Sequence, residues 1–379
     1  EEAGGMILGI YEKGAPACYV DGPSDDCQYE LFNGELDRLM PHIDACINRV
    51  PAFGEVGIKD IYNGAIAYTP DGNPIVGPAP GLKNFWLNEG HSFGITAAGG
   101  AGWQLAEWIV DGEPTVDMMG VDPRRFGPYA TRGYLKEKNE EAYSNVFTTH
   151  YPDEERGGSR PLKTAPCYDR MKALGAVFGS VYGWERPNWF MPSADYELTS
   201  EELNQSDPSK VILNKNHSKP LDDGRIVEKN SFRRSNYFEH VGNECKHVNE
   251  KVGLLDMSAF AKCVVKGSGA EAWLEYIFAN KMPKAIGRIS LVHMLSLNGG
   301  VRAEFTVYKT GPQSYYLVSA GAFETHDHDY LFKLAPKDGS VSIQRVTTQT
   351  GLLVVAGPKS RDVLQNLTDT DLSNESFKW

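Results

Sequence analysis

The spacing of hydrophobic positions in the first third of the chain predicts two helices. Apolar side chains recur at helical intervals over residues 33–50, although Pro41 within the repeat predicts a kink or a break. Apolar side chains also recur at helical intervals over residues 103–110, directly after a stretch at 89–102 that holds five glycines. The Asp-Gly-Glu-Pro sequence from Asp111 is typical of a helix end. Two further apolar runs predict short strands, at 64–68 and 82–87.

The pattern changes near residue 235, where short β-type runs begin to alternate with helical segments. The β-type runs lie at 254–255, 263–265, 305–307, 315–318 and 352–356. The helical segments lie at 269–279, 324–334 and 360–367. This interleaving predicts an α+β domain. Two polar stretches predict a connecting segment and a long surface insertion, at 127–165 and 195–232 respectively.

Composition and charge exclude several classes of protein. The 379 residues suffice for two or three domains, and 38 Lys and Arg against 50 Asp and Glu give a net charge of −12. This acidic balance argues against a nucleic-acid surface, although it leaves room for a small anionic ligand. No run approaches the roughly 20 apolar residues of a membrane span. The six cysteines contain no C-x-x-C pair, which argues against a zinc ribbon or a disulfide framework.

The two ends of the chain predict that it is an interior fragment of a longer protein. The chain begins at Glu1 without a Met, a signal peptide or a targeting segment. It stops at Trp379 in a stretch without the character of a tail.

The glycine-rich stretch at 89–102 is the first candidate site. Glycines ahead of a helix let the backbone approach a flat or charged ligand, and the helix N-terminus adds free N–H groups and partial positive charge. The spacing is not that of a G-x-G-x-x-G fingerprint, so a structural turn with close helix packing stays open. His91 alone is better explained as a partly buried, hydrogen-bonded histidine than as a catalyst.

Three other segments combine residue types that can carry chemistry. The aromatic segment at 183–190 surrounds an ion pair and a proline, which favours a packed corner between two domains. Asp256 directly follows an apolar run, where burial is costly unless the carboxylate has a partner or a role. A cap is the simpler interpretation, with Asp256 or Ser258 accepting backbone N–H bonds. His326 and His328 flank an aspartate in a predicted helix, but i,i+2 side chains diverge, so we expect no metal there.

The first half of the chain resembles a known family along several of these segments. Residues 64–78, 85–102 and 111–126 are similar, in this order, to the late part of the flavin domain in amine oxidases of the D-amino-acid-oxidase superfamily. Residues 161–168 and the Gly-Trp-Glu-Arg-Pro motif at 183–187 resemble the junction of the dimethylglycine and sarcosine dehydrogenases. In those proteins the flavin domain is fused to a folate-binding domain like the T-protein of the glycine cleavage system.

The second half resembles the start of that folate domain. The similarity covers Val252–Lys262, the predicted strand and helix that follow this segment, and Ile289–Gly300. It continues in shorter segments as far as Arg361. Ala259 stands where members often have His, and Ser296 where Asn is common. The G-x-G-x-x-G nucleotide fingerprint of the flavin family does not occur.

The resemblance implies a mixed α+β and α/β multidomain fold. The C-terminal part of a D-amino-acid-oxidase-like FAD domain would precede the first part of a T-protein-like aminomethyltransferase domain. The implied division has an FAD-domain part, a connecting segment, an insertion or linker, and a folate-domain part: 1–126, 127–190, 191–234 and 235–379.

The resemblance also implies two sets of site residues. The glycine loop would contact FAD through Ser92, Phe93, Gly94, Ile95, Thr96 and Ala97. Asp256 would be the acid that meets N5 and N10 of tetrahydrofolate, orients the folate amine and relays a proton. Further folate contacts would come from Leu291, Val292, His293 and Met294, with Tyr316 and Glu324 as weaker candidates. No metal is expected.

The implied function is FAD-dependent oxidative N-demethylation of a small N-methylated amino acid, dimethylglycine or sarcosine. Tetrahydrofolate would capture the one-carbon unit as 5,10-methylenetetrahydrofolate. An electron-transfer flavoprotein is the candidate electron acceptor, and we expect a soluble protein of the bacterial cytoplasm or the mitochondrial matrix. Three alternatives stay open. They are a folate-dependent aminomethyltransferase alone, a non-catalytic relative similar to the regulatory subunit of pyruvate dehydrogenase phosphatase, and an oxidase that uses oxygen.

Overall fold

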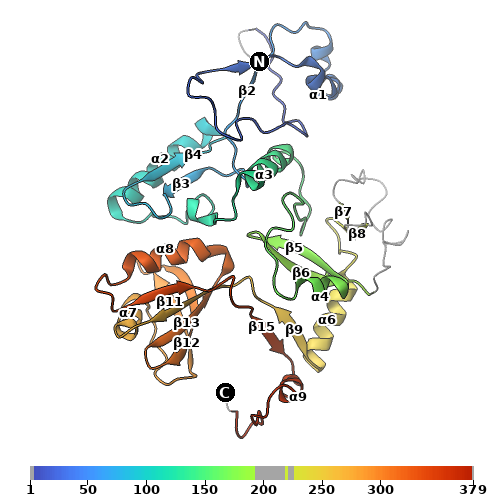
Figure 1. Cartoon of the computed structure of the whole chain (residues 1–379). Helices are drawn as coiled ribbons and strands as arrows, with labels where there is room; N and C mark the ends of the chain where they lie inside the picture. Colours follow the sequence, from blue (N-terminus) through green and yellow to red (C-terminus); the bar gives the residue numbers. More distant parts are fainter. Residues whose placement is uncertain (1–3, 193–217, 221–225, 378–379) are drawn as a thin grey trace. The chain divides into compact units, whose positions relative to one another are not determined.

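The computed structural model describes residues 4–192, 218–220 and 226–377, which belong to two compact units (Figure 1). The N-terminal unit comprises residues 1–149 and the C-terminal unit residues 150–379. Most of the predicted insertion at 195–232 lies outside the described residues. The four-part domain division stays a prediction.

The N-terminal unit combines short strand pairs with three α-helices in its described part, residues 4–149. Its strands are β1 (Leu31–Phe32), β2 (Asn63–Gly64), β3 (Ile75–Pro78) and β4 (Trp86–Glu89). Its helices are α1 (Leu36–Arg49), α2 (Gly94–Asp111) and α3 (Arg132–Asn145), with 3-10 turns η1 (Pro51–Gly54) and η2 (Pro123–Arg125). Strands β1 and β2 pair antiparallel, as do β3 and β4.

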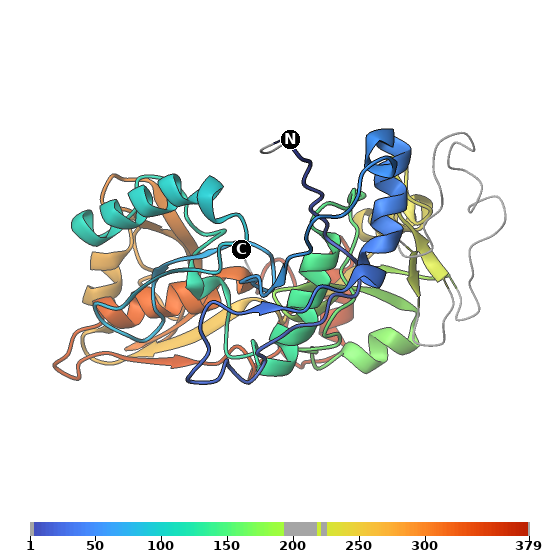
Figure 2. The ribbon, with the colours of Figure 1, turned by 90° about the horizontal axis from the view of Figure 1, so that it is seen from above.

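The core of this unit lies where α2 packs on the β3–β4 hairpin. Trp108 of α2 is buried, and its ring meets the Trp86 ring edge-on at 6.1 Å. Gly77 has a φ of +139°, and a Cβ there would stand 2.8 Å from the Trp108 ring, so only glycine fits. Figure 2 shows the ribbon from above, with α2 visible along its length.

The glycine-rich loop is shorter than the sequence predicts, because α2 begins at Gly94 and not near residue 103. Gly99, Gly100 and Gly102 lie inside the helix. Each glycine costs a helix about 1 kcal/mol relative to alanine. The predicted end is confirmed, since Gly112 caps the helix in the left-handed conformation with a φ of +84°.

Other predicted elements need correction. Helix α1 continues through Pro41, which is exposed like Asp37, so water can bond the carbonyl that loses its helical donor. The strand predicted at 64–68 ends at Gly64, because its partner β1 has only two residues. The strand predicted at 82–87 starts at Trp86. The connecting segment at 127–165 contains α3, which Thr131 caps by accepting a hydrogen bond from the Tyr134 amide.

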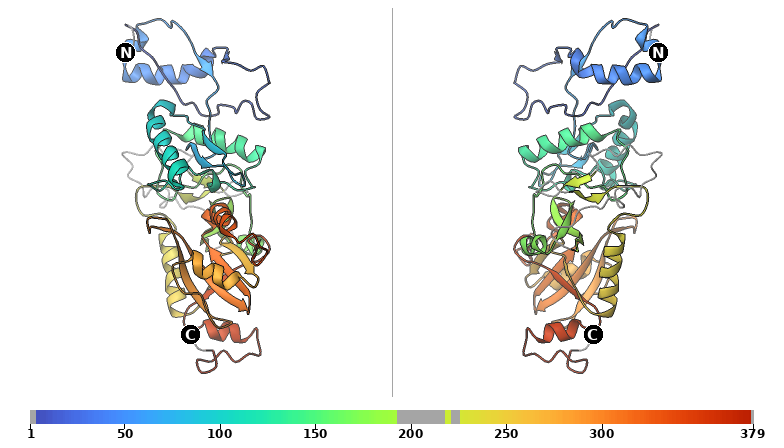
Figure 3. Two further views of the ribbon diagram at one scale, coloured as in Figure 1. Left: turned by 90° about the vertical axis from the view of Figure 1, so that its left-hand side faces the viewer. Right: turned by 90° about the vertical axis from the view of Figure 1, so that its right-hand side faces the viewer.

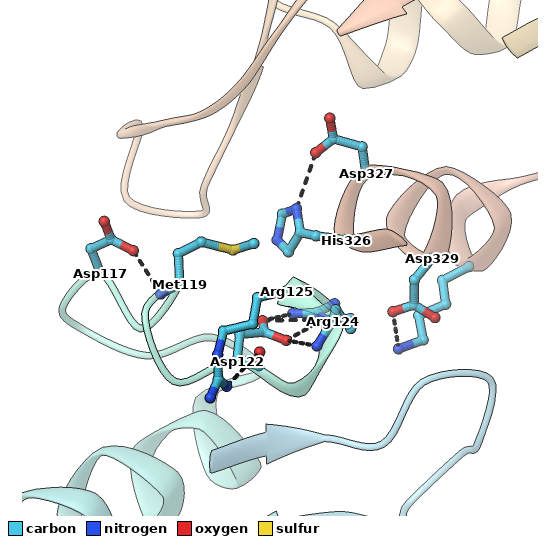
Figure 4. A network of polar contacts seen from close by, with 9 residues as sticks. Asp117, Met119, Asp122, Arg124, Arg125, His326, Asp327 and Asp329 are labelled. Carbon is cyan, nitrogen blue, oxygen red and sulfur yellow. Dashed lines mark hydrogen bonds and ion pairs between the residues drawn. The ribbon is translucent and has the colours of Figure 1, made fainter. Parts of the chain in front are cut away.

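A buried ion pair between Asp122 and Arg124 stabilises the segment that follows α2 in the sequence (Figure 4). Asp122 accepts hydrogen bonds from the Arg124 amide at 2.8 Å and from the Arg124 guanidinium at 2.6 Å. Arg125 reaches Asp71 at 2.7 Å and the Asn73 carbonyl at 3.0 Å. These bonds tie the segment at 122–125 to the turn ahead of β3.

The C-terminal unit contains most of the strands. They are β5 (Ala176–Val181), β6 (Trp184–Phe190), β7 (Ser218–Pro220), β8 (Ile226–Lys229), β9 (Gly253–Asp256), β10 (Ala261–Lys266), β11 (Ile289–Leu295), β12 (Val301–Gly311), β13 (Ser314–Ser319), β14 (Ser342–Arg345) and β15 (Leu353–Ala356). The helices are α4 (Tyr168–Ala173), α6 (Phe238–Glu250), α7 (Ala270–Ile277), α8 (Glu324–Leu334) and α9 (Ser360–Gln365), with a 3-10 turn η4 (Gly321–Phe323).

A five-stranded antiparallel sheet forms the centre of this unit, in the order β11-β12-β13-β10-β14. Its core cluster joins strand residues to Trp273 and Leu274 of α7 and Leu331 of α8. The predicted α+β pattern is therefore confirmed. Strand β9 pairs with β15 in a separate ribbon, and both views of Figure 3 show α6 alongside it. The aromatic segment at 183–190, expected as a corner, mostly forms strand β6 of a hairpin with β5.

Among the described residues, no helix is long and apolar enough to cross a membrane.

Candidate functional site

The first group of predicted site residues lies where β4 turns into α2. Gly90 makes the turn with a φ of +70°, and a Cβ there would stand 2.7 Å from Thr69 Cγ2. Phe93 occupies the position before the helix and caps no backbone N–H with its side chain. The first helical bond runs from the Ala97 amide to the Phe93 carbonyl at 3.0 Å. The N–H groups of the first turn therefore point away from the helix without helical acceptors.

The side chains of this turn are mostly exposed. Ser92 and Ala97 are half-buried, whereas Phe93, Gly94 and Thr96 are exposed and Ile95 is 99% exposed. The Phe93 ring stacks on Tyr11 at 6.5 Å between ring centres. These six residues can offer backbone donors, an aromatic face and apolar surface to a planar anionic group.

His91 lies beside this turn and is anchored by one bond. Its Nε2 lies 2.8 Å from Asn88 Oδ1. Its Nδ1 is buried and has no hydrogen-bond partner in the described part of the chain.

Asp256 ends β9 and heads a tight turn at 257–260. Its Oδ1 accepts a hydrogen bond from the Ser258 amide at 2.9 Å, as a capping carboxylate would. Its Oδ2 is buried and has no hydrogen-bond partner among the residues that the structure describes. Leaving a buried acceptor unpaired costs about 1–3 kcal/mol, so such an oxygen suits a ligand donor. Asp256 therefore caps the turn through Oδ1 and keeps Oδ2 available as an acceptor for a ligand.

Strand β11 divides its four predicted folate residues between two faces, because side chains alternate along a strand. Val292 and Met294 are fully buried in the core cluster. Leu291 is 52% exposed and lies on the opposite face with His293. The His293 ring is held between Asn280 Oδ1 at 3.0 Å and Glu304 Oε2 at 3.2 Å. Leu291 and His293 therefore offer side-chain surface to a ligand, whereas Val292 and Met294 support the strand from within.

Tyr316 and Glu324 lie nearer to the Asp256 turn than β11 does. Tyr316 is on β13, which pairs directly with β10, and burial raises the pKa of its phenol. Glu324 is the first residue of α8, and its charge acts on the β10 residue Lys262, as does that of Asp256. Strand β11 is three strand positions from β10, which is about 14 Å at the usual spacing. The order of the strands thus sets the β11 residues apart from β10.

Lys262 is the residue of this region that the sequence analysis missed. It is fully buried on β10, and its Nζ donates to the Ser258 carbonyl at 2.7 Å. A lysine inside the apolar run at 261–265 was the available signal, because a buried ammonium group requires partners.

Helix α8 carries a buried polar cluster on the C-terminal unit. His326 Nδ1 lies 3.1 Å from Asp327 Oδ1, a contact drawn in Figure 4, and Ser319 Oγ donates to Asp327 Oδ2 at 2.8 Å. Burial lowers the pKa of His328 to about 4, so this imidazole stays neutral at neutral pH. Among the described residues, no three side chains of metal-ligating type come together.

Three family models match the chain in sequence order. Residues 3–108 match the FAD dependent oxidoreductase model, and residues 111–165 match the FAD dependent oxidoreductase central domain. Residues 167–379, more than half of the chain, match the GCVT N-terminal domain. The chain therefore belongs to the GCVT N-terminal domain family, with two FAD dependent oxidoreductase segments ahead of that domain. The predicted resemblance and fold class are confirmed.

Individual relatives match over nearly the whole chain. Human mitochondrial dimethylglycine dehydrogenase is 36% identical over 100% of this chain and 41% of its own length. Mouse mitochondrial sarcosine dehydrogenase is 29% identical over 99% of this chain and 42% of its own length. The mouse mitochondrial regulatory subunit of pyruvate dehydrogenase phosphatase is 28% identical over 99% of this chain and 40% of its own length. The chain thus spans about two fifths of the length of these curated relatives.

Proposed function

We propose that the protein carrying this chain is an FAD-dependent enzyme that oxidatively demethylates a small N-methylated amino acid, either dimethylglycine or sarcosine. We further propose that tetrahydrofolate captures the released one-carbon unit as 5,10-methylenetetrahydrofolate. The similarity of the whole chain to dimethylglycine dehydrogenase carries this proposal. The unpaired Oδ2 of Asp256 supports its folate half.

In the flavin half, the N-terminal turn of α2 would hold FAD. Bound FAD supplies the two-electron acceptor for oxidation of the N-methyl carbon. The backbone N–H groups at the start of α2 and the positive end of the helix dipole favour negative charge placed against them. Ile95 and the Phe93 ring would cover apolar surface of the cofactor. No side chain is assigned as a base here, because oxidation of an amine requires mainly its neutral form and correct alignment.

In the folate half, Asp256 would act through its free oxygen. The Ser258 amide holds Oδ1, so the carboxylate cannot turn freely, and Oδ2 can accept a hydrogen bond from an amine of the bound ligand. A carboxylate in this position orients the amine and takes up or relays the proton that leaves as the new C–N bond forms. Leu291 and His293 lie on β11, three strand positions from β10, and would contribute exposed side chains to a more distant part of the folate site.

The absorption spectrum of the purified full-length protein tests the flavin half. We expect flavin bands that bleach when dimethylglycine or sarcosine is added without oxygen. The amino acid that bleaches them identifies the substrate. A colourless full-length protein would contradict the proposal.

A second candidate function follows from the regulatory relative, which matches 99% of this chain. A non-catalytic protein of this family would keep the fold and lose the response of its spectrum to N-methylated amino acids. An aminomethyltransferase without flavin chemistry is disfavoured, because residues 3–108 match the FAD dependent oxidoreductase model.

The electron acceptor and the compartment belong to the same proposal. We propose an electron-transfer flavoprotein as acceptor, in the mitochondrial matrix of a eukaryote or the cytoplasm of a bacterium. Steady peroxide production during turnover would identify an oxidase that uses oxygen instead.

A further inference from the structure

Three aromatic rings from separate segments of the N-terminal unit meet beside the start of α2. We call Tyr11, Phe93 and Phe147 the aromatic corner. Tyr11 belongs to the N-terminal segment, Phe93 precedes α2, and Phe147 follows α3. The centre of the Tyr11 ring lies 6.5 Å from that of Phe93 and 4.8 Å from that of Phe147. The Phe93 and Phe147 centres are 6.2 Å apart, so each ring neighbours the other two.

The planes of these rings are arranged like two walls and a floor. Tyr11 and Phe93 are nearly parallel, with an angle of 23° between their planes. Phe147 stands at 80° to both. Because the ring centres are so close together, one cation can lie within about 6 Å of all three, which is the range of cation–π attraction. Aromatic cages for methylated ammonium groups are built from such sets of rings.

Two rings of the aromatic corner keep much of their surface open. Phe147 is 70% exposed and Phe93 is 44% exposed, whereas Tyr11 is half-buried. Exposed apolar side chains that cluster in this way mark an interaction site, in contrast to scattered ones. Tyr11 is held in place by Tyr143, because the two rings pack at 5.1 Å and the Tyr143 hydroxyl donates to Glu12 at 2.9 Å. The corner thus combines one fixed wall with accessible ring surface.

The proposed oxidation creates a cation of the kind that such rings attract. The N-methyl carbon gives up a hydride to the two-electron acceptor, and the lone pair of the nitrogen forms the C=N bond of an iminium. A neutral amine thereby gains a positive charge on a group with apolar substituents. Ring faces carry negative potential, so their attraction for the substrate grows as this charge develops. Groups that bind the transition state more strongly than the substrate accelerate the reaction.

Phe93 relates the aromatic corner to the proposed cofactor site. It occupies the position before α2 and is one of the six residues that would contact FAD. A nitrogen held in the corner therefore lies beside the turn at which FAD would bind, as the transfer of a hydride from its methyl group requires.

We propose that the aromatic corner receives the N-methylated nitrogen of the substrate and stabilises, by cation–π attraction, the positive charge that develops there during oxidation. This inference rests on the proposed function for the identity of the substrate, but the binding of a methylated ammonium group can be measured without turnover. Phe147 is the residue on which the test depends, because Phe93 would also contact the cofactor.

The experiment measures the binding of two small molecules to the full-length flavin-loaded protein by titration calorimetry. Trimethylglycine carries a permanent positive charge on a methylated nitrogen and, without a lone pair there, cannot be oxidised to an iminium. Its carbon analogue 3,3-dimethylbutanoate has the same shape and carboxylate but no positive charge. The difference between their affinities isolates the attraction of the corner for a cation.

We expect trimethylglycine to bind about fivefold more tightly than its carbon analogue, or more. Phe147→Leu keeps apolar bulk without the ring, and should remove most of this difference by weakening the binding of trimethylglycine. Replacing Phe147 by 3,4,5-trifluorophenylalanine, which withdraws negative charge from the ring face at similar shape, should act in the same direction. Phe85→Leu is the matched control, because it makes the same change at another exposed phenylalanine of this unit, and it should leave both affinities in place.

The same variant separates attraction for the charge from simple binding of the substrate. At saturating substrate without oxygen, the flavin of Phe147→Leu should bleach about fivefold more slowly than that of the wild type, since the ring acts on charge that develops during oxidation. If Phe147→Leu disturbs the fold, the fluorinated ring decides the result.

Equal binding of the two molecules by the wild type would overturn the proposal, as would unchanged binding of trimethylglycine in folded Phe147→Leu. The proposed function fails by a different result. A wild-type flavin that neither dimethylglycine nor sarcosine bleaches, while trimethylglycine binding still depends on Phe147, would refute the oxidation and leave the corner as a site for methylated ammonium groups.

Discussion

The start of α2 and the turn after Asp256, the two candidate binding sites, hold their hydrogen-bonding groups in opposite ways. The first presents backbone N–H groups on an exposed helix, and its side chains, such as Ile95, contribute little packing within the described structure. The second presents one carboxylate oxygen from a turn held by the buried Lys262 beside a dense sheet core. Backbone donors survive almost any side-chain substitution, whereas a positioned carboxylate depends on each neighbour. Substitutions should therefore separate the two regions clearly.

The largest difference in stability is expected between a substitution in the core of the sheet and a substitution at the start of α2. Phe305→Ala removes a buried ring that packs against Phe278 at 5.1 Å between ring centres, and should lower the free energy of unfolding of the C-terminal unit by about 3–5 kcal/mol. Ile95→Ala on α2 should change stability by no more than about 0.5 kcal/mol. Hydrogen exchange resolved along the chain measures both. Equal losses from the two substitutions would show that the exposed face of α2 is packed in the protein.

The buried ion pair behind α2 should be the most sensitive point of the N-terminal unit. Asp122→Ala leaves the Arg124 guanidinium buried without its carboxylate, which should cost about 3 kcal/mol or more. Asp117→Ala is the matched control, since Asp117 is exposed and accepts a hydrogen bond from the Met119 amide at 2.9 Å. Thermal unfolding monitored in the N-terminal unit distinguishes the two. A similar small effect from both variants would mean that Arg124 finds another partner.

Replacing glycine by alanine should change the stability of α2 in opposite directions at its C-terminal cap and in its interior. Gly112→Ala forces a φ of +84° on a residue with a Cβ and should destabilise the helix by about 1–2 kcal/mol. Gly99→Ala lies within the helix, and a Cβ there meets nothing within 4 Å, so it should stabilise the helix by about 0.4–1 kcal/mol. Helix content and melting temperature report both changes. Destabilisation by Gly99→Ala would indicate that another surface covers this face.

The smallest expected effect is the pH dependence of a partly exposed network that joins Glu271 of α7 to the sheet. Bonds from Lys309, Tyr315 and Lys284 lower the pKa of Glu271 from 4.5 to about 2. Because this pKa is depressed in the folded state, the network stabilises the fold above about pH 4.5, and that contribution is lost as the pH falls towards 2. Solvent screening keeps it at about 1 kcal/mol or less. The stability difference between Glu271→Gln and wild type should therefore shrink over that interval. A constant difference would assign the role of Glu271 to packing.

The sequence predicts elements well where the hydrophobic period decides them. The β-type runs of the sheet are found where expected, because they bury a regular apolar face. The helix at 324–334 is also found, although Leu331 is the only apolar residue among those that the described helix buries. Helix α3 was missed because it buries no such face, and its signal is the Thr131 cap. The strand predicted at 64–68 was too long, because an apolar run forms a strand only where a neighbouring strand can pair with it, and β1 has only two residues.

The candidate site shows the same limit at the level of single residues. The resemblance to the folate-domain family indicated Asp256. The pattern of apolar and polar positions cannot reveal that Oδ1 of this residue accepts a hydrogen bond while Oδ2 has no partner among the described residues. The alternation along β11 could have separated Leu291 and His293 from the buried Val292 and Met294. Lys262 was missed because the spatial relation between a strand and a turn depends on tertiary packing.

The fate of the labelled N-methyl carbon in Asp256→Asn tests the central claim most directly. With tetrahydrofolate present, the wild-type protein should deliver most of this carbon to 5,10-methylenetetrahydrofolate. The variant should oxidise the amine at an unchanged rate and lose capture by about a hundredfold, with free formaldehyde rising in proportion. Normal capture by Asp256→Asn would contradict the role of this carboxylate, and an equal loss of amine oxidation would contradict the division of labour between the two regions.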